Sequence, residues 1–192
     1  MEPTIIIIPY SKLVENQGLL TIITLGHVAH GKSTLVRKIT SVKTQKHKAE
    51  LERNITINLG YANAKIWYDK EKDELFSLPS NVPPPKESQT DNSRYQLMQH
   101  ISFIDAPGHE SLMSTMISGT HNFDVAFLLI AGNDKVMPQS QTYEHLLALA
   151  AVKKQLDLGL ILHNKLDLIS KEETLLNKEK IMEFIDGSPA AQ

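Results

Sequence analysis

The segment GHVAHGKS at residues 26–33 constrains this chain more than any other, because it fits the pattern G-x-x-x-x-G-K-[ST]. The residues before it, LLTIITLG from Leu19, are apolar and β-branched, which predicts a strand buried on both faces of a parallel sheet. The residues after it carry apolar side chains at helical spacing, which predicts a helix over 32–41. A glycine-rich turn between a strand and a helix is typical of a phosphate-binding loop. An ordinary strand-to-helix turn is the alternative.

Each part of this loop has a chemical task. Glycines let backbone N–H groups turn toward a β-phosphate, and the helix start adds the positive end of its dipole. Lys32 reaches the β- and γ-phosphates, and the Ser33 hydroxyl binds Mg²⁺. We therefore expect a nucleotide to contact the loop residues His27, Val28, Ala29, His30, Gly31, Lys32, Ser33 and Thr34.

A second segment, DAPGHE, begins at Asp105 directly after a predicted strand over 97–104. An aspartate at the carboxyl end of a neighbouring strand lies at the second position for Mg²⁺, and Gly108 can bring its N–H to a γ-phosphate. By itself this segment also fits a plain turn, with His109 capping the helix that follows. The phosphate loop favours the nucleotide site.

A third segment, Asn164-Lys165-Leu166-Asp167, follows a predicted strand over 158–162. Guanine presents two adjacent donors, N1–H and the 2-amino group, and one carboxylate accepts both, whereas adenine has no 2-amino group. Asn164 and Lys165 would brace the loop and cover the ring. The segment therefore predicts GTP or GDP as the ligand, although a lone NKxD also occurs on solvated strand exits.

A long polar segment, SVKTQKHKAELERN over 41–54, precedes a predicted strand over 55–68. It is too long and too charged for an ordinary turn, which predicts a mobile functional loop. Thr56 follows it, and its hydroxyl can close on Mg²⁺ when the γ-phosphate is present and let go after hydrolysis. As an alternative, Thr56 is only a β-branched strand residue.

The remaining pattern alternates strands with helices, which predicts an α/β fold with a mostly parallel sheet and helices on both faces. Further helices are expected over 109–120, 139–152 and 171–185, and further strands over 124–130 and 158–162. The domain is expected to span 19–192, after an N-terminal extension over 1–18. Four of the nine prolines lie between Pro79 and Pro85, which predicts a flexible surface insertion at 69–97.

Composition excludes several classes of protein. The 192 residues carry a formal net charge of −2, which gives no overall electrostatic footprint for nucleic acid. No apolar run is long enough for a membrane span, and no secretory signal precedes the domain. The chain has no cysteine, which excludes disulfides and thiolate metal sites and fits an intracellular protein.

The phosphate loop, Thr56, DxPG and NKxD follow one another in the order typical of translation-type GTPases. Longer segments make the resemblance more specific: GHVAHGKST, ELERNITINLGYANAKI, DAPGHESLMSTMISG, LLIAGNDKVMPQSQTYEHL and NKLDL. Over about residues 19–184, apart from the insertion, the chain resembles the gamma subunit of eukaryotic and archaeal translation initiation factor two, a relative of elongation factor Tu. The resemblance implies a P-loop GTPase fold.

That family implies a function. Its members bind and hydrolyse GTP within a cytoplasmic alpha-beta-gamma heterotrimer, and in the GTP form they carry methionylated initiator tRNA to the small ribosomal subunit. The resemblance implies that the beta subunit contacts this domain, whereas the alpha subunit and the tRNA need β-barrel domains. An activating protein promotes hydrolysis, and in eukaryotes an exchange factor reloads GTP.

The resemblance also implies roles for individual residues. His109 would orient the attacking water, with Thr56 and Lys32 completing the catalytic set. Val28 and Ile55 would form an apolar pair that screens His109 from the γ-phosphate. An imidazole held off in this way suits a slow, gated hydrolase.

Three departures from the family pattern are visible. Ala106 stands where relatives often carry Thr or Cys. The cysteine-bearing zinc knuckle of many relatives has no counterpart, since residues 69–99 contain neither Cys nor His, so we expect no zinc. The Ser-Ala loop, the last strand and two β-barrel domains would be expected only beyond Gln192.

Two other functions stay open from sequence. One is a P-loop ATPase or kinase, for which the phosphate loop and Asp105 would serve equally well. The carboxylate of Asp167 argues against an ATPase or kinase, because a site that selects adenine has no use for it. The other is a non-catalytic G-domain fragment that acts as an interaction module.

Overall fold

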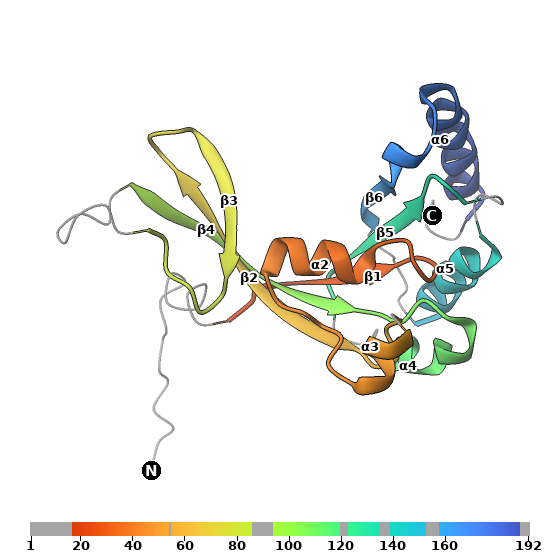
Figure 1. The fold of residues 1–192 in the computed structure, drawn as a ribbon, viewed down its shortest axis with the longest axis horizontal. Helices are drawn as coiled ribbons and strands as arrows, with labels where there is room; N and C mark the ends of the chain where they lie inside the picture. Colours follow the sequence, from red (N-terminus) through yellow and green to blue (C-terminus); the bar gives the residue numbers. More distant parts are fainter. Residues whose placement is uncertain are drawn as a thin grey trace, which may run out of the picture.

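The computed structural model describes residues 17–53, 55–85, 94–119, 123–134, 139–152 and 158–188. Figure 1 shows one six-stranded sheet in the order β3-β2-β4-β1-β5-β6. The strands are β1 (Leu20–Leu25), β2 (Gly60–Asp69), β3 (Glu74–Pro79), β4 (Tyr95–Asp105), β5 (Val125–Ala131) and β6 (Leu158–Asn164). Except for its last two residues, the predicted extension over 1–18 lies outside the described residues.

The central strand β1 sets the architecture of the sheet. It pairs in parallel with β4 on one side and β5 on the other, and β6 pairs in parallel with β5. The carboxyl ends of these four strands therefore meet at one edge, where an α/β fold places its ligand site. The predicted α/β fold with a mostly parallel sheet is confirmed, while β2 is antiparallel to both of its neighbours.

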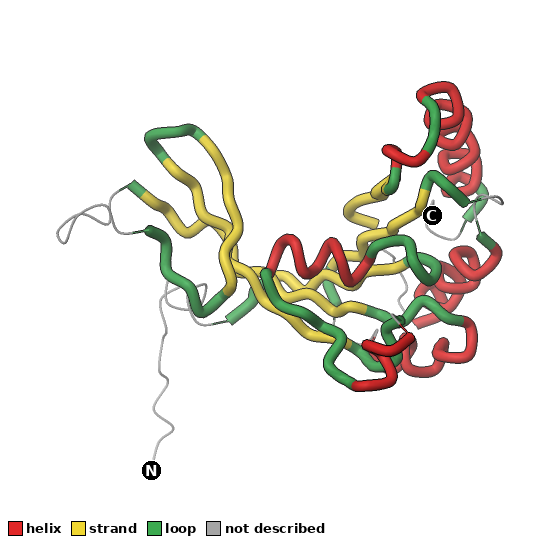
Figure 2. The backbone as a smooth tube through the Cα atoms, in the orientation of Figure 1, coloured by secondary structure: helices red, strands yellow, loops and turns green. Residues whose placement is uncertain are grey.

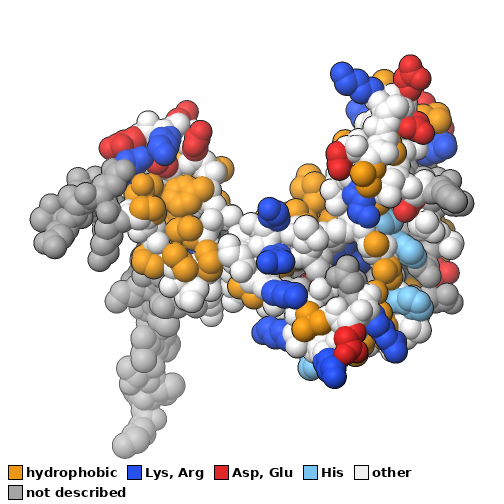
Figure 3. Space-filling model, in the orientation of Figure 1, with side chains coloured by type: hydrophobic (Ala, Val, Ile, Leu, Met, Phe, Trp, Pro, Cys, Tyr) orange, Lys and Arg blue, Asp and Glu red, His pale blue; other side chains and the backbone are white. Residues whose placement is uncertain are grey.

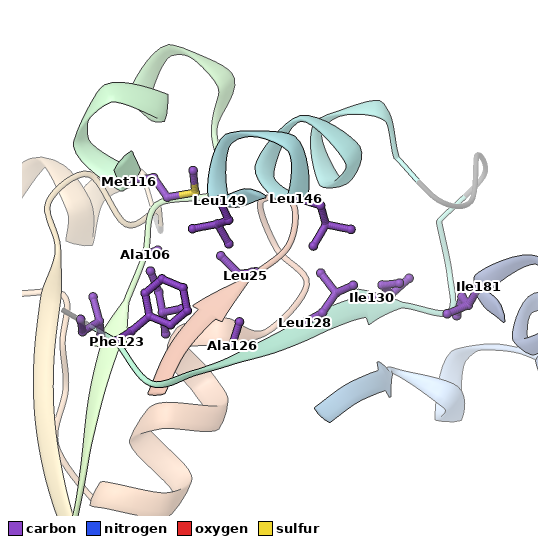
Figure 4. Close-up of a cluster of buried hydrophobic side chains, with 12 residues drawn as sticks. Leu25, Ala106, Met116, Phe123, Ala126, Leu128, Ile130, Leu146, Leu149 and Ile181 are labelled. Carbon is purple, nitrogen blue, oxygen red and sulfur yellow. The ribbon is translucent and has the colours of Figure 1, made fainter. Parts of the chain in front are cut away.

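Helices cover both faces of this sheet, because β1 buries both of its faces. Ile22 belongs to a buried cluster with Val36, whereas Ile23 and Leu25 belong to the opposite cluster with Leu146, shown in Figure 4. No helix among the described residues is long and apolar enough to cross a bilayer. The helices are α2 (Lys32–Thr40), α3 (Lys48–Arg53), α4 (Met113–Gly119), α5 (Ser140–Val152) and α6 (Lys171–Asp186), with short 3₁₀ turns at Glu110–Leu112 and Leu166–Leu168.

The structure has strands over much of the segment 69–97, where the sequence predicts a flexible insertion. β3 forms an antiparallel hairpin with β2, and β4 begins at Tyr95 rather than Leu97. Figures 1 and 2 show this hairpin extending the sheet beyond the helices. Arg94 Nε and Nη2 donate to the Asp69 carboxylate at 2.9 and 2.8 Å, and these bonds lower the pKa of Asp69 to about 2. Residues 86–93 of the predicted insertion lie outside the described residues.

The polar segment 41–54 also holds more structure than expected. It contains the short helix α3, and β2 begins at Gly60 rather than Ile55. The residues between α3 and β2 carry Thr56 toward α2, where its hydroxyl meets that of Ser33. The segment is therefore folded against the carboxyl edge of the sheet.

Candidate nucleotide-binding site

The phosphate loop lies between β1 and α2, as the sequence predicts. Its backbone turns through positive φ angles at Gly26 (128°), Ala29 (65°) and Gly31 (99°), which favours glycine at the two larger values. Gly31 is the N-cap of α2 and provides no side-chain cap. The first N–H groups of α2 therefore lack a side-chain acceptor and suit an anion.

Lys32 lies buried beneath this loop. Its Nζ donates to the carbonyl oxygens of Gly26 at 2.7 Å and His27 at 2.9 Å, which leaves one of its three protons for a ligand. Burial lowers the pKa of Lys32 to about 8, and the nearby Asp105 carboxylate opposes that shift. A polyphosphate would favour the charged ammonium in the same way.

Gly108 approaches the phosphate loop from the loop after β4. A Cβ at this position would lie 2.8 Å from both Gly26 O and the carbonyl carbon of His27 and would also collide with Lys32 Nζ. Only glycine fits here without a shift of backbone. The structure thus brings the DAPG segment against the phosphate loop.

These elements surround a cleft of about 470 Å³, a size suited to a small ligand. Figure 3 shows Lys and Arg side chains gathered over α2 and the segment after it, where Arg37, Lys38 and Lys43 are exposed. Such a patch attracts anions. The cleft is lined by Val28, Ala29, Gly31, Lys32, Ser33, Thr34, Gln45, Ile55, Thr56, Gly108, Asn164 and Lys165.

The two predicted hydroxyl ligands for Mg²⁺ meet in this cleft. Ser33 Oγ lies 2.8 Å from Thr56 Oγ1, although the two residues belong to different elements. Neighbouring oxygen ligands at roughly 2.0–2.1 Å from an octahedral Mg²⁺ lie about 2.9 Å apart. The spacing and the oxygen chemistry of this pair therefore fit two adjacent positions around Mg²⁺.

Asp105 lies deeper than a direct metal ligand would. Its side chain is fully buried and accepts hydrogen bonds from the hydroxyls of Thr44, at 2.5 Å, and Thr24, at 3.4 Å. It does not line the cleft. Its present effect on the site is electrostatic, through Lys32.

The predicted base-reading segment lies at the end of β6. Asn164 Nδ2 donates to His30 O at 2.9 Å, so Asn164 braces the phosphate loop. Lys165 lines the cleft with a left-handed φ of 59°. Asp167 lies in the exposed 3₁₀ turn that follows and does not line the cleft.

The ring of His30 is used by the scaffold. It is 1% exposed, with Nδ1 2.8 Å from Leu129 O and Nε2 2.6 Å from Asp134 Oδ2. Burial lowers the pKa of His30 despite these two contacts. The ring anchors the loop to β5, so only the backbone of His30 is available to a nucleotide. His27 also lies outside the cleft lining, with its Nδ1 3.1 Å from Val28 O.

His109, the predicted catalytic residue, is exposed and lies outside the cleft lining. Ser111 N–H donates to His109 Nδ1 at 3.2 Å, which places the proton of the neutral ring on Nε2. The two residues of the predicted apolar screen, Val28 and Ile55, do line the cleft.

Sequence reasoning missed three residues of the segment 41–54. Gln45 lines the cleft and donates to Thr56 Oγ1 at 3.4 Å. Thr44 binds Asp105, and Glu50 is a buried carboxylate. Their polar run offers no periodic signal, since Thr44 binds a residue 61 positions away and Glu50 binds backbone N–H groups, which no residue pattern indicates.

Comparisons with known proteins agree with this geometry. The family description "Elongation factor Tu GTP binding domain" matches residues 17–190. The chain is 43% identical over 189 residues to eukaryotic translation initiation factor 2 subunit 3 of Drosophila melanogaster, covering 93% of this chain and 38% of that protein. It is 44% identical over 181 residues to the gamma subunit of Encephalitozoon cuniculi, covering 92% and 40%. The chain thus spans about two fifths of these relatives.

Two solved structures share the fold. A bacterial selenocysteine-specific elongation factor matches with a TM-score of 0.63 and 23% identity, over 89% of this chain and 24% of that one. The elongation factor SelB of Methanococcus maripaludis, solved with a GTP analogue, matches with a TM-score of 0.57 and 19% identity, over 89% and 27%. The resemblance to the gamma subunit of initiation factor two is confirmed, and the chain belongs to the family of elongation factor Tu GTP-binding domains.

Proposed function

We propose that this chain binds and hydrolyses GTP as the GTP-binding domain of an initiation factor two gamma subunit. The contact between Ser33 Oγ and Thr56 Oγ1 carries this proposal, because it brings a loop residue to the metal side of the phosphate loop. When bound there, Mg²⁺ would neutralise charge on the β- and γ-phosphates. The high identity to gamma subunits of two organisms supports the same assignment.

The residues then have distinct tasks. Lys32 and the N–H groups of the loop bind phosphate, Ser33 and Thr56 hold the metal, and Asp105 supports the charge of Lys32. Asp167 reads the base and His109 orients water once its ring leaves Ser111. Gating by such a movement agrees with slow hydrolysis.

Competition by unlabelled nucleotides tests this function directly. We expect GTP and GDP to displace a fluorescent GDP analogue from the chain, and ATP not to compete at about a hundredfold higher concentration, because adenine offers neither of the two donors that the Asp167 carboxylate would accept from guanine. Equal competition by ATP would identify a P-loop ATPase or kinase instead.

The partners follow from the relatives. We propose that the beta subunit binds this domain, and that the full-length factor assembles with the alpha subunit, methionylated initiator tRNA and the small ribosomal subunit in the cytoplasm. A GTPase-activating protein and an exchange factor would act on the cycle. The near-neutral net charge of −2 agrees with tRNA binding that depends on other domains.

A non-catalytic interaction module is the second candidate. It is favoured by the position of His109, whose ring contacts Ser111 and lies outside the cleft lining. Single-turnover hydrolysis of bound GTP separates the two functions, since a module would bind GTP and release it unchanged.

The absence of zinc is a separate prediction. A structural zinc site needs about four Cys or His ligands in paired spacings, and residues 69–99 carry neither. We expect metal analysis of the tag-free protein to find far less than one zinc per chain. About one zinc per chain would contradict this expectation.

A further inference from the structure

Glu50 is a buried carboxylate in the segment that leads to Thr56. It lies on α3 and is only 2% exposed. Its Oε2 accepts the backbone N–H groups of Lys46 and His47, and its Oε1 accepts those of Ile57 and Asn58, all at 3.0 Å. One side chain thus holds four backbone donors.

These bonds make the charge of Glu50 tolerable in a buried position. Burial by itself raises the pKa of Glu50, but the four N–H groups outweigh it and lower the pKa below its ordinary value. Bonds from N–H donors to a carboxylate are also stronger than bonds between neutral groups. The carboxylate is therefore ionised, and each of its oxygens accepts two hydrogen bonds.

The positions of the four donors show which part of the chain the carboxylate holds together. Two precede α3 and two follow it, so Glu50 closes a loop of 13 residues from Lys46 to Asn58 onto itself. Thr56 is the residue directly before Ile57, whose N–H is held. The backbone N–H of Ile55 is also bonded to Glu50, through the carbonyl oxygen, at 3.2 Å.

We propose that Glu50 is the positioning residue that holds Thr56 against Ser33 on the metal side of the cleft. This role rests on the proposed function, in which Thr56 contacts Mg²⁺ in the GTP form. It makes Glu50 necessary for the difference between GTP and GDP rather than for nucleotide binding as such. Glu50 touches neither nucleotide nor metal.

Glutamine at this position cannot replace glutamate. One of its two terminal groups is an NH₂ donor, which would face two backbone N–H donors in place of an acceptor. Glu50→Gln therefore loses two hydrogen bonds and places its NH₂ group against two buried backbone N–H groups, while the volume of the side chain is nearly unchanged. Glu52→Gln is the matched control, because Glu52 lies on the same helix, is exposed, and contacts only Lys48 among the described ion pairs, at 3.7 Å.

The test combines amide hydrogen exchange in the nucleotide-free protein with affinities for GDP and a non-hydrolysable GTP analogue in Mg²⁺. For Glu50→Gln we expect exchange about tenfold faster or more at the amides of Lys46, His47, Ile57 and Asn58. We expect the Kd of the GTP analogue to rise about tenfold and that of GDP to change less than about twofold. Glu52→Gln should match the unaltered chain in every measurement.

Thr56→Ala distinguishes positioning from general support. It should reproduce the loss of GTP-analogue affinity, and the double variant Glu50→Gln/Thr56→Ala should lose little more, since both changes remove the same contact. Equal losses for GDP and the GTP analogue, additive losses in the double variant, or loss of the circular dichroism signal in Glu50→Gln would overturn the proposal. If the unaltered chain binds no guanine nucleotide, the proposed function fails instead, and the exchange rates still report whether Glu50 holds the loop.

Discussion

Lys32→Ala is expected to raise the Kd for Mg²⁺–GTP by about 100-fold or more, the loss of charge-assisted bonds to two phosphates. The ammonium is already held by Gly26 O and His27 O, so it is preorganised toward the ligand. Equilibrium binding of a fluorescent nucleotide measures the effect. Lys178→Ala, exposed on α6 and outside the basic patch over α2, is the control and should bind normally.

Variants of Ser33 and His109 should separate nucleotide binding from the hydrolysis step. Ser33→Ala should weaken binding only when Mg²⁺ is present, because its hydroxyl is the proposed metal ligand. His109→Ala should leave binding nearly intact and lower single-turnover hydrolysis by roughly 10²–10⁴-fold, since an imidazole that orients water acts only near the transition state. Equal losses of affinity in Lys32→Ala, Ser33→Ala and His109→Ala would contradict this division.

The lowered pKa of Lys32 should make nucleotide affinity depend on pH. The free protein keeps Lys32 charged below a pH of about 8, so nucleotide affinity should be flat there. Above that pH, binding must first protonate the amine, and affinity should fall by about tenfold per pH unit. Titration of the Lys32→Ala variant should lack this decline.

Asp167→Asn should change which base is bound. In the proposed role the carboxylate of Asp167 would accept two donors of guanine, whereas asparagine offers one acceptor and one donor, which suits the 2-carbonyl of xanthine. We expect affinity for GDP to fall by about 100-fold or more, and affinity for xanthosine diphosphate to rise above it. A variant that still prefers GDP would show that Asp167 does not read the base.

Local patterns predicted most of the parallel sheet and the cleft. The phosphate loop could be found from sequence because its glycines, Lys32 and Ser33 act within eight residues. The β3 hairpin was missed because charges and prolines dominate its composition, and the residues ELFSLP do not alternate between polar and apolar side chains as a half-buried strand does. Its partner strand β2 is antiparallel and also contributes buried side chains to the core. No local pattern indicates that these two strands pair.

The residues that sequence could not assign act through contacts that no residue pattern indicates. Glu50 acts through backbone N–H groups, which every residue type except proline provides, so no residue pattern indicates its partners. His30 matches the loop pattern as a variable position, yet its ring is fixed by Leu129 and Asp134, about a hundred residues away. Such contacts exist only once β1 and β5 are side by side.

The bond from Asn164 Nδ2 to His30 O joins the two loops that would hold opposite ends of a nucleotide. A side chain at Gly31 would collide with Asn164, so the loops touch as closely as glycine allows. Neither loop can therefore shift along the cleft without the other. In the proposed complex the protein would set the distance from base to phosphate, and the cleft would select its ligand by length as well as by base.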